Sequence, residues 1–140
     1  YETACILRGD RDIPIIKDDR LREVNFGINE GKCSLELKKD KNSPIYKFFE
    51  DPGNYQPPEG GESLHDVCKR TKEFMEEIIE PQKDKLSNVL IAGHGAMNKG
   101  IMCHVLNHPI KEYWSGGLQK NCGIIIVKLD ENGYEKIGEI

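Results

Sequence analysis

Residues 88–100, NVLIAGHGAMNKG, contain the junction that decides the fold. The apolar run within residues 88–92 predicts a strand that is buried on both faces, as in a parallel sheet. The spacing that follows predicts a helix from about residue 96 to residue 107, which stops before Pro109. A buried strand followed directly by a helix indicates a layered α/β protein.

His94 lies between two glycines at this junction. In open α/β sheets, ligands bind at the carboxyl ends of the strands. The N-terminus of the next helix directs free N–H groups and the positive end of its dipole at the same loop. Because Gly93 and Gly95 have no side chains to block a ligand, we predict an anion site that contains the His94 imidazole.

A second helix is predicted over residues 63–79, where SLHDVCKRTKEFMEEII carries an apolar stripe at helical spacing. Ser63 is a suitable N-cap, and Asp66 follows three residues later in the capping-box position. Pro81 follows the end of the pattern. This is the clearest helix signal in the chain.

Shorter elements are predicted elsewhere. One helix ends at residue 8 and is capped by Gly9, and another begins near Pro44. The predicted strands cover residues 13–17, 122–129 and 134–139, with a turn at residues 130–133 between the last two. Residues 32–62 are rich in proline and glycine, and we expect them to form a lid-like insertion.

Composition limits the class of function. The 140-residue chain is most simply one domain, with 37% hydrophobic and 31% charged residues. A net charge of −4 and a pI near 5.6 give no general basic surface for nucleic acid. No apolar run approaches the roughly 20 residues needed to cross a bilayer. The five cysteines form no C-x-x-C pair and predict free thiols in a reducing, cytoplasmic compartment.

Other titratable residues carry weaker signals. Glu23, in LREVNFG, has the chemistry of a general acid or base, but from the residues alone a surface ion pair with Arg20 or Arg22 is the preferred interpretation. His104 and His108 share one helical face without a third ligand, so no metal site is predicted.

Four segments taken together resemble a known family. LREVNFGINEGK, GGESLHDVCKR, VLIAGHGAMNKGIMCHVL and NCGIIIV occur in this order, and the set resembles the histidine phosphatase superfamily, in its phosphoglycerate mutase-like branch. The resemblance runs across nearly the whole chain. It implies that residues 1–140 form one domain of a three-layer α/β sandwich, in which helices flank a mostly parallel central sheet.

The resemblance also implies a two-step mechanism. A histidine in an R-H-G motif takes the phosphoryl group, and water or a second substrate oxygen then removes it from the phosphohistidine. His94 matches the second histidine of the phosphate pocket, and Glu23 matches the carboxylate that protonates the leaving oxygen. Gly95 and Ala96 match backbone donors to the phosphate. The implied partner is a small phosphorylated substrate, with no metal, cofactor, nucleic acid or membrane.

No R-H-G segment occurs in these 140 residues, and the first residue is Tyr1. We therefore expect that the sequence lacks a beginning that supplies the nucleophile, the first strand and the first helix. Without that strand, residues 88–92 would leave a sheet edge uncovered. Three alternatives stay open. The first is a phosphatase, favoured over a mutase because residues 32–62 are short for enclosing a bisphosphate. The second is a phosphate-binding domain without turnover. The third is a truncated product that folds poorly or only as a homo-oligomer.

Overall fold

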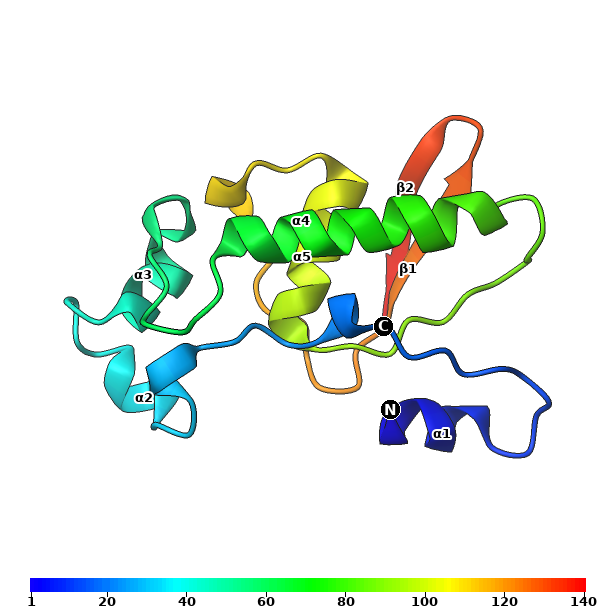
Figure 1. The fold of residues 1–140 in the computed structure, drawn as a ribbon. Helices are drawn as coiled ribbons and strands as arrows, with labels where there is room; N and C mark the ends of the chain where they lie inside the picture. The colour runs from blue at the N-terminus through cyan, green and yellow to red at the C-terminus, as the bar shows by residue number, and fades with distance from the viewer.

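Two long helices cross at the centre of the molecule. The computed structural model describes residues 1–140, apart from the side chain of Ser34. Helix α4 (Leu64–Phe74) packs against α5 (Gly95–Leu106), and a hairpin of β1 (Ile125–Asp130) and β2 (Gly133–Glu139) lies beside them (Figure 1). The shorter α-helices are α1 (Glu2–Arg8), α2 (Ser34–Leu37) and α3 (Pro44–Glu50). Short 3-10 turns occupy Asp19–Leu21, Gly27–Asn29, Pro52–Asn54, Glu80–Gln82 and Ile110–Glu112.

Helix α4 begins as its sequence predicts. The Ser63 hydroxyl accepts a hydrogen bond from the Asp66 N–H at 3.1 Å, and the Asp66 carboxylate accepts one from the Ser63 N–H at 3.2 Å. This reciprocal pair is a capping box, which satisfies two backbone donors at the helix start. The helix then continues into a π-helical turn at Met75–Ile79 before the 3-10 turn that contains Pro81.

Helix α5 starts at Gly95 and ends at Leu106, and its C-cap residue Asn107 adopts a left-handed conformation with φ of 52°. Its approach to α4 is close because Gly100 has no side chain. A Cβ atom there would lie 2.8 Å from the Thr71 hydroxyl and 3.1 Å from a Val67 methyl. Gly100 therefore sets the spacing of the two helices.

Two apolar clusters hold the helices in place. The first contains Val24, Phe48, Tyr55, Leu64, Val67, Ala96, Cys103 and Tyr113. The second contains Phe74, Met75, Met97, Ile101, Met102 and Val105. Ile125 and Val127 of β1 and Tyr134 of β2 pack against the second cluster, and this contact fixes one face of the hairpin on α5.

The hairpin confirms the prediction of two strands joined by a turn, with β1 starting three residues later than expected. Asp130 pairs with Gly133, whose φ of 101° suits glycine, and the strands run antiparallel. Only one face of the hairpin is covered, since Ile126 and Ile137 remain 39% and 56% exposed.

Two predicted strands do not form. Residues 13–17 and 88–92 have no regular secondary structure, and the sheet of the described chain contains only β1 and β2. Val89 and Leu90, expected to be buried, are 49% and 64% exposed. A strand needs a neighbour to pair its N–H and C=O groups, and these apolar segments have none within the described part. The three-layer sandwich with a mostly parallel sheet is therefore not formed by these residues.

The segment 32–62 contains the predicted helix at Pro44, and its aromatic side chains anchor it to the rest of the molecule. Phe48 is 1% exposed, and its ring meets the ring of Trp114 at a centroid distance of 5.1 Å. The Trp114 indole N–H also donates to the Phe48 carbonyl. Figure 1 shows α2 and α3 together at the end of the molecule farthest from the hairpin.

Candidate functional site at the N-terminus of helix α5

His94 is the N-cap residue of α5, with extended backbone angles (φ −123°, ψ 161°). Its side chain makes no capping hydrogen bond, and the residue is exposed. The imidazole therefore stands beside the first turn of the helix and does not satisfy the helix's own donors. A histidine in this position is free to hydrogen-bond a ligand that binds at the helix start.

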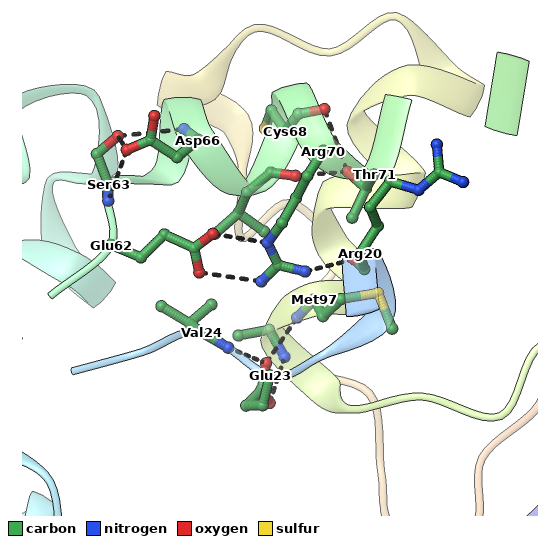
Figure 2. A network of polar contacts seen from close by, with 12 residues as sticks. Arg20, Glu23, Val24, Glu62, Ser63, Asp66, Cys68, Arg70, Thr71 and Met97 are labelled. Atoms are coloured by element: carbon green, nitrogen blue, oxygen red, sulfur yellow. Dashed lines mark hydrogen bonds and ion pairs between the residues drawn. The ribbon is translucent and has the colours of Figure 1, made fainter. Parts of the chain in front are cut away.

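Glu23, not His94, accepts hydrogen bonds from N–H groups at the start of α5. Its carboxylate accepts hydrogen bonds from the Met97 N–H at 2.8 Å and from the Ala96 N–H at 3.2 Å (Figure 2). It also accepts one from the Val24 N–H at 3.0 Å. A negative charge at this end complements the helix dipole. The fold thus brings Glu23 to the same helix turn as His94, although Met97 lies 74 positions further along the chain.

The two predicted backbone donors differ in what they can offer. The Ala96 N–H already donates to Glu23, and Ala96 is only 7% exposed. Within the described part of the chain, the Gly95 N–H donates to no backbone or side-chain acceptor. Gly95 is therefore the donor available to an anion. Ala96 would serve only if the Glu23 carboxylate moved away.

The glycines beside His94 lie close to neighbouring side chains. A Cβ atom at Gly93 would lie 2.2 Å from the Met97 side chain, and one at Gly95 would lie 3.0 Å from Leu118. The loop that carries Leu118 is tied to the first turn of α5, because the Asn98 amide donates to Gln119 at 2.7 Å. Gly93, Gly95 and the exposed Leu118 thus border the site.

An internal ion pair holds the segment that carries Glu23. The Arg70 guanidinium makes a two-pronged contact with Glu62, at 2.6 and 3.0 Å, and also donates to the Arg20 carbonyl (Figure 2). The Glu62 N–H donates to the Asn25 carbonyl at 2.8 Å. Through these bonds α4 clamps the chain on both sides of Glu23.

The ion-pair interpretation of Glu23 is wrong in this structure. Arg20 instead binds Asp18 and Glu77, each at 2.7 Å, and Arg22 binds Asp19 at 3.1 Å. The hydrogen bond with Arg20 holds the pKa of Asp18 below its ordinary value. The arginines near Glu23 in sequence are thus engaged elsewhere.

Two supporting residues escaped the sequence analysis. Arg70 is the last residue of the GGESLHDVCKR segment. An arginine on an amphipathic helix does not by itself predict an internal ion pair. Tyr113 is 1% exposed, and its hydroxyl donates to the Ala96 carbonyl at 2.7 Å. Burial raises the pKa of Tyr113 far above its ordinary value, so this phenol stays a donor. A buried tyrosine that fixes the first turn of α5 is recognisable only in three dimensions.

The other histidine pair lies in the C-terminal half of α5 and just beyond it, away from His94. His104 Nε2 is 3.1 Å from a Glu80 carboxylate oxygen, and the Tyr134 hydroxyl donates to the same oxygen at 3.0 Å. Among the described residues, no group of three or more histidine, cysteine or acidic side chains is arranged to hold a metal ion. Likewise, no described helix is long and apolar enough to cross a membrane.

Comparison with known proteins identifies the family. The model of the histidine phosphatase superfamily (branch 1) matches residues 1–137. Phosphoserine phosphatase 1 of Hydrogenobacter thermophilus is 25% identical over 94% of this chain, and the match covers 60% of that relative. A 2,3-bisphosphoglycerate-dependent phosphoglycerate mutase of Cytophaga hutchinsonii is 33% identical over 66% of this chain and 43% of that protein. The chain belongs to the histidine phosphatase superfamily.

A solved structure supports the same assignment. Bacillus stearothermophilus YhfR is 32% identical and superposes with a TM-score of 0.82, over 97% of this chain and 66% of that one. The chain therefore spans 60% of the first relative, 43% of the second and 66% of the solved structure. The fold is of the histidine phosphatase type, and its relatives include both phosphatases and phosphoglycerate mutases.

Proposed function

We propose that this chain carries the acid and second-histidine half of a phosphatase that works through a phosphohistidine and acts on a small phosphorylated metabolite. The observation that carries the proposal is the meeting of Glu23 and His94 at one helix N-terminus. The Glu23 carboxylate binds the Ala96 and Met97 N–H groups, directly beside the His94 N-cap. A carboxylate, an imidazole and a free helix N–H within one turn are the groups that phosphoryl transfer uses for proton donation and charge stabilisation.

Each group has a distinct role in the proposal. His94 and the Gly95 N–H hold the non-bridging phosphate oxygens, and the dipole of α5 stabilises their charge. Glu23 transfers a proton to the leaving oxygen, for which one of its oxygens must exchange a backbone N–H for the substrate. Arg70 holds the segment that carries Glu23 by binding Glu62 and the Arg20 carbonyl. Arg70 is thus a positioning residue.

The nucleophile is proposed to come from polypeptide outside these 140 residues. None of the four histidines lies in an R-H-G segment. The apolar segments at residues 13–17 and 88–92 have the composition of strands but pair with no other strand of the described chain. One further strand bearing the histidine between them would complete a parallel sheet and the three-layer sandwich. Within this proposal, residues 1–140 form a single domain that lacks its first strand and helix.

Phosphatase is proposed over mutase because the segment at residues 32–62 is short and held down. Phe48 is buried in the core, and Trp114 binds its carbonyl. An insertion anchored in this way leaves the site open to water, which is the acceptor in hydrolysis. A mutase must enclose a substrate long enough to return the phosphoryl group to it.

The experiment is His94→Ala in the purified full-length protein, assayed with p-nitrophenyl phosphate. We expect kcat to fall by roughly 100- to 1,000-fold, since loss of one stabilising donor commonly costs that much. The matched control is His65→Ala, which removes an exposed histidine from the first turn of α4. Activity close to wild type in His94→Ala, or an equal loss in both variants, would contradict the proposal.

A further inference from the structure

Helices α4 and α5 each carry a cysteine next to their crossing point. A Cβ atom at Gly100 would meet Val67 and Thr71, so the helices are close at this point. Cys68 directly follows Val67 on α4, and Cys103 lies three residues after Gly100 on α5. Cys103 is 8% exposed and belongs to the buried core, and Cys68 packs against that core. Cys68 and Cys103 thus lie on the two sides of one contact between α4 and α5.

The pair is open to solvent through a cavity of about 250 Å³. Cys68 and Cys103 both line it, together with Lys72, His104 and His108. A small neutral oxidant can enter a cavity of this size, since one water needs only a small fraction of the volume. The two cysteines therefore pack against the core on one side and are reachable through the cavity on the other.

We propose that Cys68 and Cys103 form a reversible disulfide that links α4 to α5 when the protein meets hydrogen peroxide. All five cysteines are free thiols in the structure. Cys33 and Cys122 are exposed and lie on loops or short elements outside the helix pair, so they do not compete for either core thiol. Both cysteines line one cavity, and the two helices that carry them are packed against each other, which is the arrangement that a disulfide between neighbouring elements needs.

The chemistry of the two thiols is unequal. Interaction with the Cys68 thiol, aided by the charge of Lys99, lowers the pKa of the Cys103 thiol. Interaction with the Cys103 thiol, together with burial, raises the pKa of Cys68. Cys103 is thus the sulfur that reacts first as a thiolate, and Cys68 is the resolving thiol.

The reaction balances in two steps. The Cys103 thiolate attacks one peroxide oxygen, an S–O bond forms as the O–O bond breaks, and hydroxide leaves and takes up a proton as water. The Cys68 sulfur then attacks the Cys103 sulfur, the S–O bond breaks, and the second hydroxide leaves with the Cys68 proton as water. Two thiols are oxidised to one disulfide while one peroxide is reduced to two waters.

The test uses the purified full-length protein carrying Cys5→Ser, Cys33→Ser and Cys122→Ser, so that the core pair is the only one from this part of the chain. After native treatment with hydrogen peroxide, we expect the intact mass to fall by about 2 Da. Digestion without reductant should give one peptide that joins residues 68 and 103. The apparent Tm should rise by roughly 10 °C, because the bond closes a loop of the unfolded chain, and return with dithiothreitol.

The matched control adds Cys68→Ser to the same background. It should show no loss of mass and should instead gain oxygen on Cys103. The proposal is overturned if the unaltered pair gains oxygen atoms or stays unmodified under conditions that oxidise Cys33 in the wild-type protein. It is also overturned if the linked form has a lower Tm than the reduced form, because the helices would then have to distort to bond.

Discussion

The α4–α5 pair and the segment at residues 88–92 both carry apolar side chains, but only those of the helices are buried. In the helix pair, Leu64 and Met97 are 1% and 0% exposed, and every turn is packed. In the segment that leads directly into α5, Leu90 is 64% exposed and no strand forms. A helix satisfies its backbone hydrogen bonds within itself, whereas a strand depends on a neighbour that must be supplied from elsewhere.

In the proposed phosphatase, this difference decides which groups of the site are supplied by residues 1–140. The groups that depend on helices are in place, including the His94 N-cap and the donors that bind Glu23. In the proposal, a group carried by a further central strand would lie beside residues 88–92, where Val89 and Leu90 are exposed. The helices therefore position His94 and Glu23, and in the proposal a completed sheet adds the nucleophile.

The strongest test of the comparison removes the same side chain from each region. Leu64→Ala should cost roughly 3 kcal/mol in the free energy of unfolding, because it leaves a cavity in the core. Leu90→Ala should change that free energy by less than about 0.5 kcal/mol in the 140-residue chain, since the leucine is exposed. Urea unfolding of both variants checks this, and similar losses would break the comparison.

A second test concerns the ion pair behind Glu23. Arg70→Met should destabilise the protein by roughly 2–4 kcal/mol, because it leaves the Glu62 carboxylate, 21% exposed, without its partner. The control is Lys69→Met, whose amine lies 4.0 Å from Glu73 and whose side chain is 75% exposed. We expect the control to stay within about 0.5 kcal/mol. Thermal or urea unfolding that ranks the two variants equally would contradict the clamp.

The smallest expected effect belongs to the start of α4. Ser63→Ala should cost about 1 kcal/mol at neutral pH through loss of the cap. The hydrogen bond with Ser63 holds the pKa of Asp66 below its ordinary value of 3.8. The ionised carboxylate therefore stabilises the folded state above that value and loses this effect as the pH falls through its lower, folded pKa. The cost of Ser63→Ala should shrink when urea unfolding is repeated near pH 3.

Ser43 provides the matched control for this pH dependence. Its hydroxyl caps α3 by accepting from the Ile45 N–H at 3.2 Å, without a capping-box carboxylate. Ser43→Ala should cost a similar amount at pH 7 and nearly the same amount near pH 3. A parallel decline for both caps would show that Asp66 has no special part in the effect.

The helices were predictable because their signals are local. Ser63 and Asp66 stand three residues apart, and Pro44 and Gly9 mark a start and an end that the structure confirms. The hairpin was predictable for the same reason, since its turn lies within four residues. The strands at residues 13–17 and 88–92 were predicted from apolar composition, which indicates burial but supplies no partner.

The site was only partly predictable. His94 was placed correctly at the start of α5 by its flanking glycines. From the residues alone, Glu23 was assigned to a surface ion pair, because a contact with Met97 spans 74 positions that no local pattern encodes. Only the family resemblance placed Glu23 in the site, and its catalytic role, like that of His94, stays a prediction.

The most direct test of the central claim measures how Glu23→Gln changes the dependence of kcat/KM on the leaving group, in the full-length protein. A general acid matters most when the departing oxygen is strongly basic. We predict a loss of about 100-fold or more for an alkyl phosphate, and of less than about 10-fold for p-nitrophenyl phosphate. An equal loss for both substrates would show that Glu23 only caps α5, and would contradict its role as the leaving-group acid.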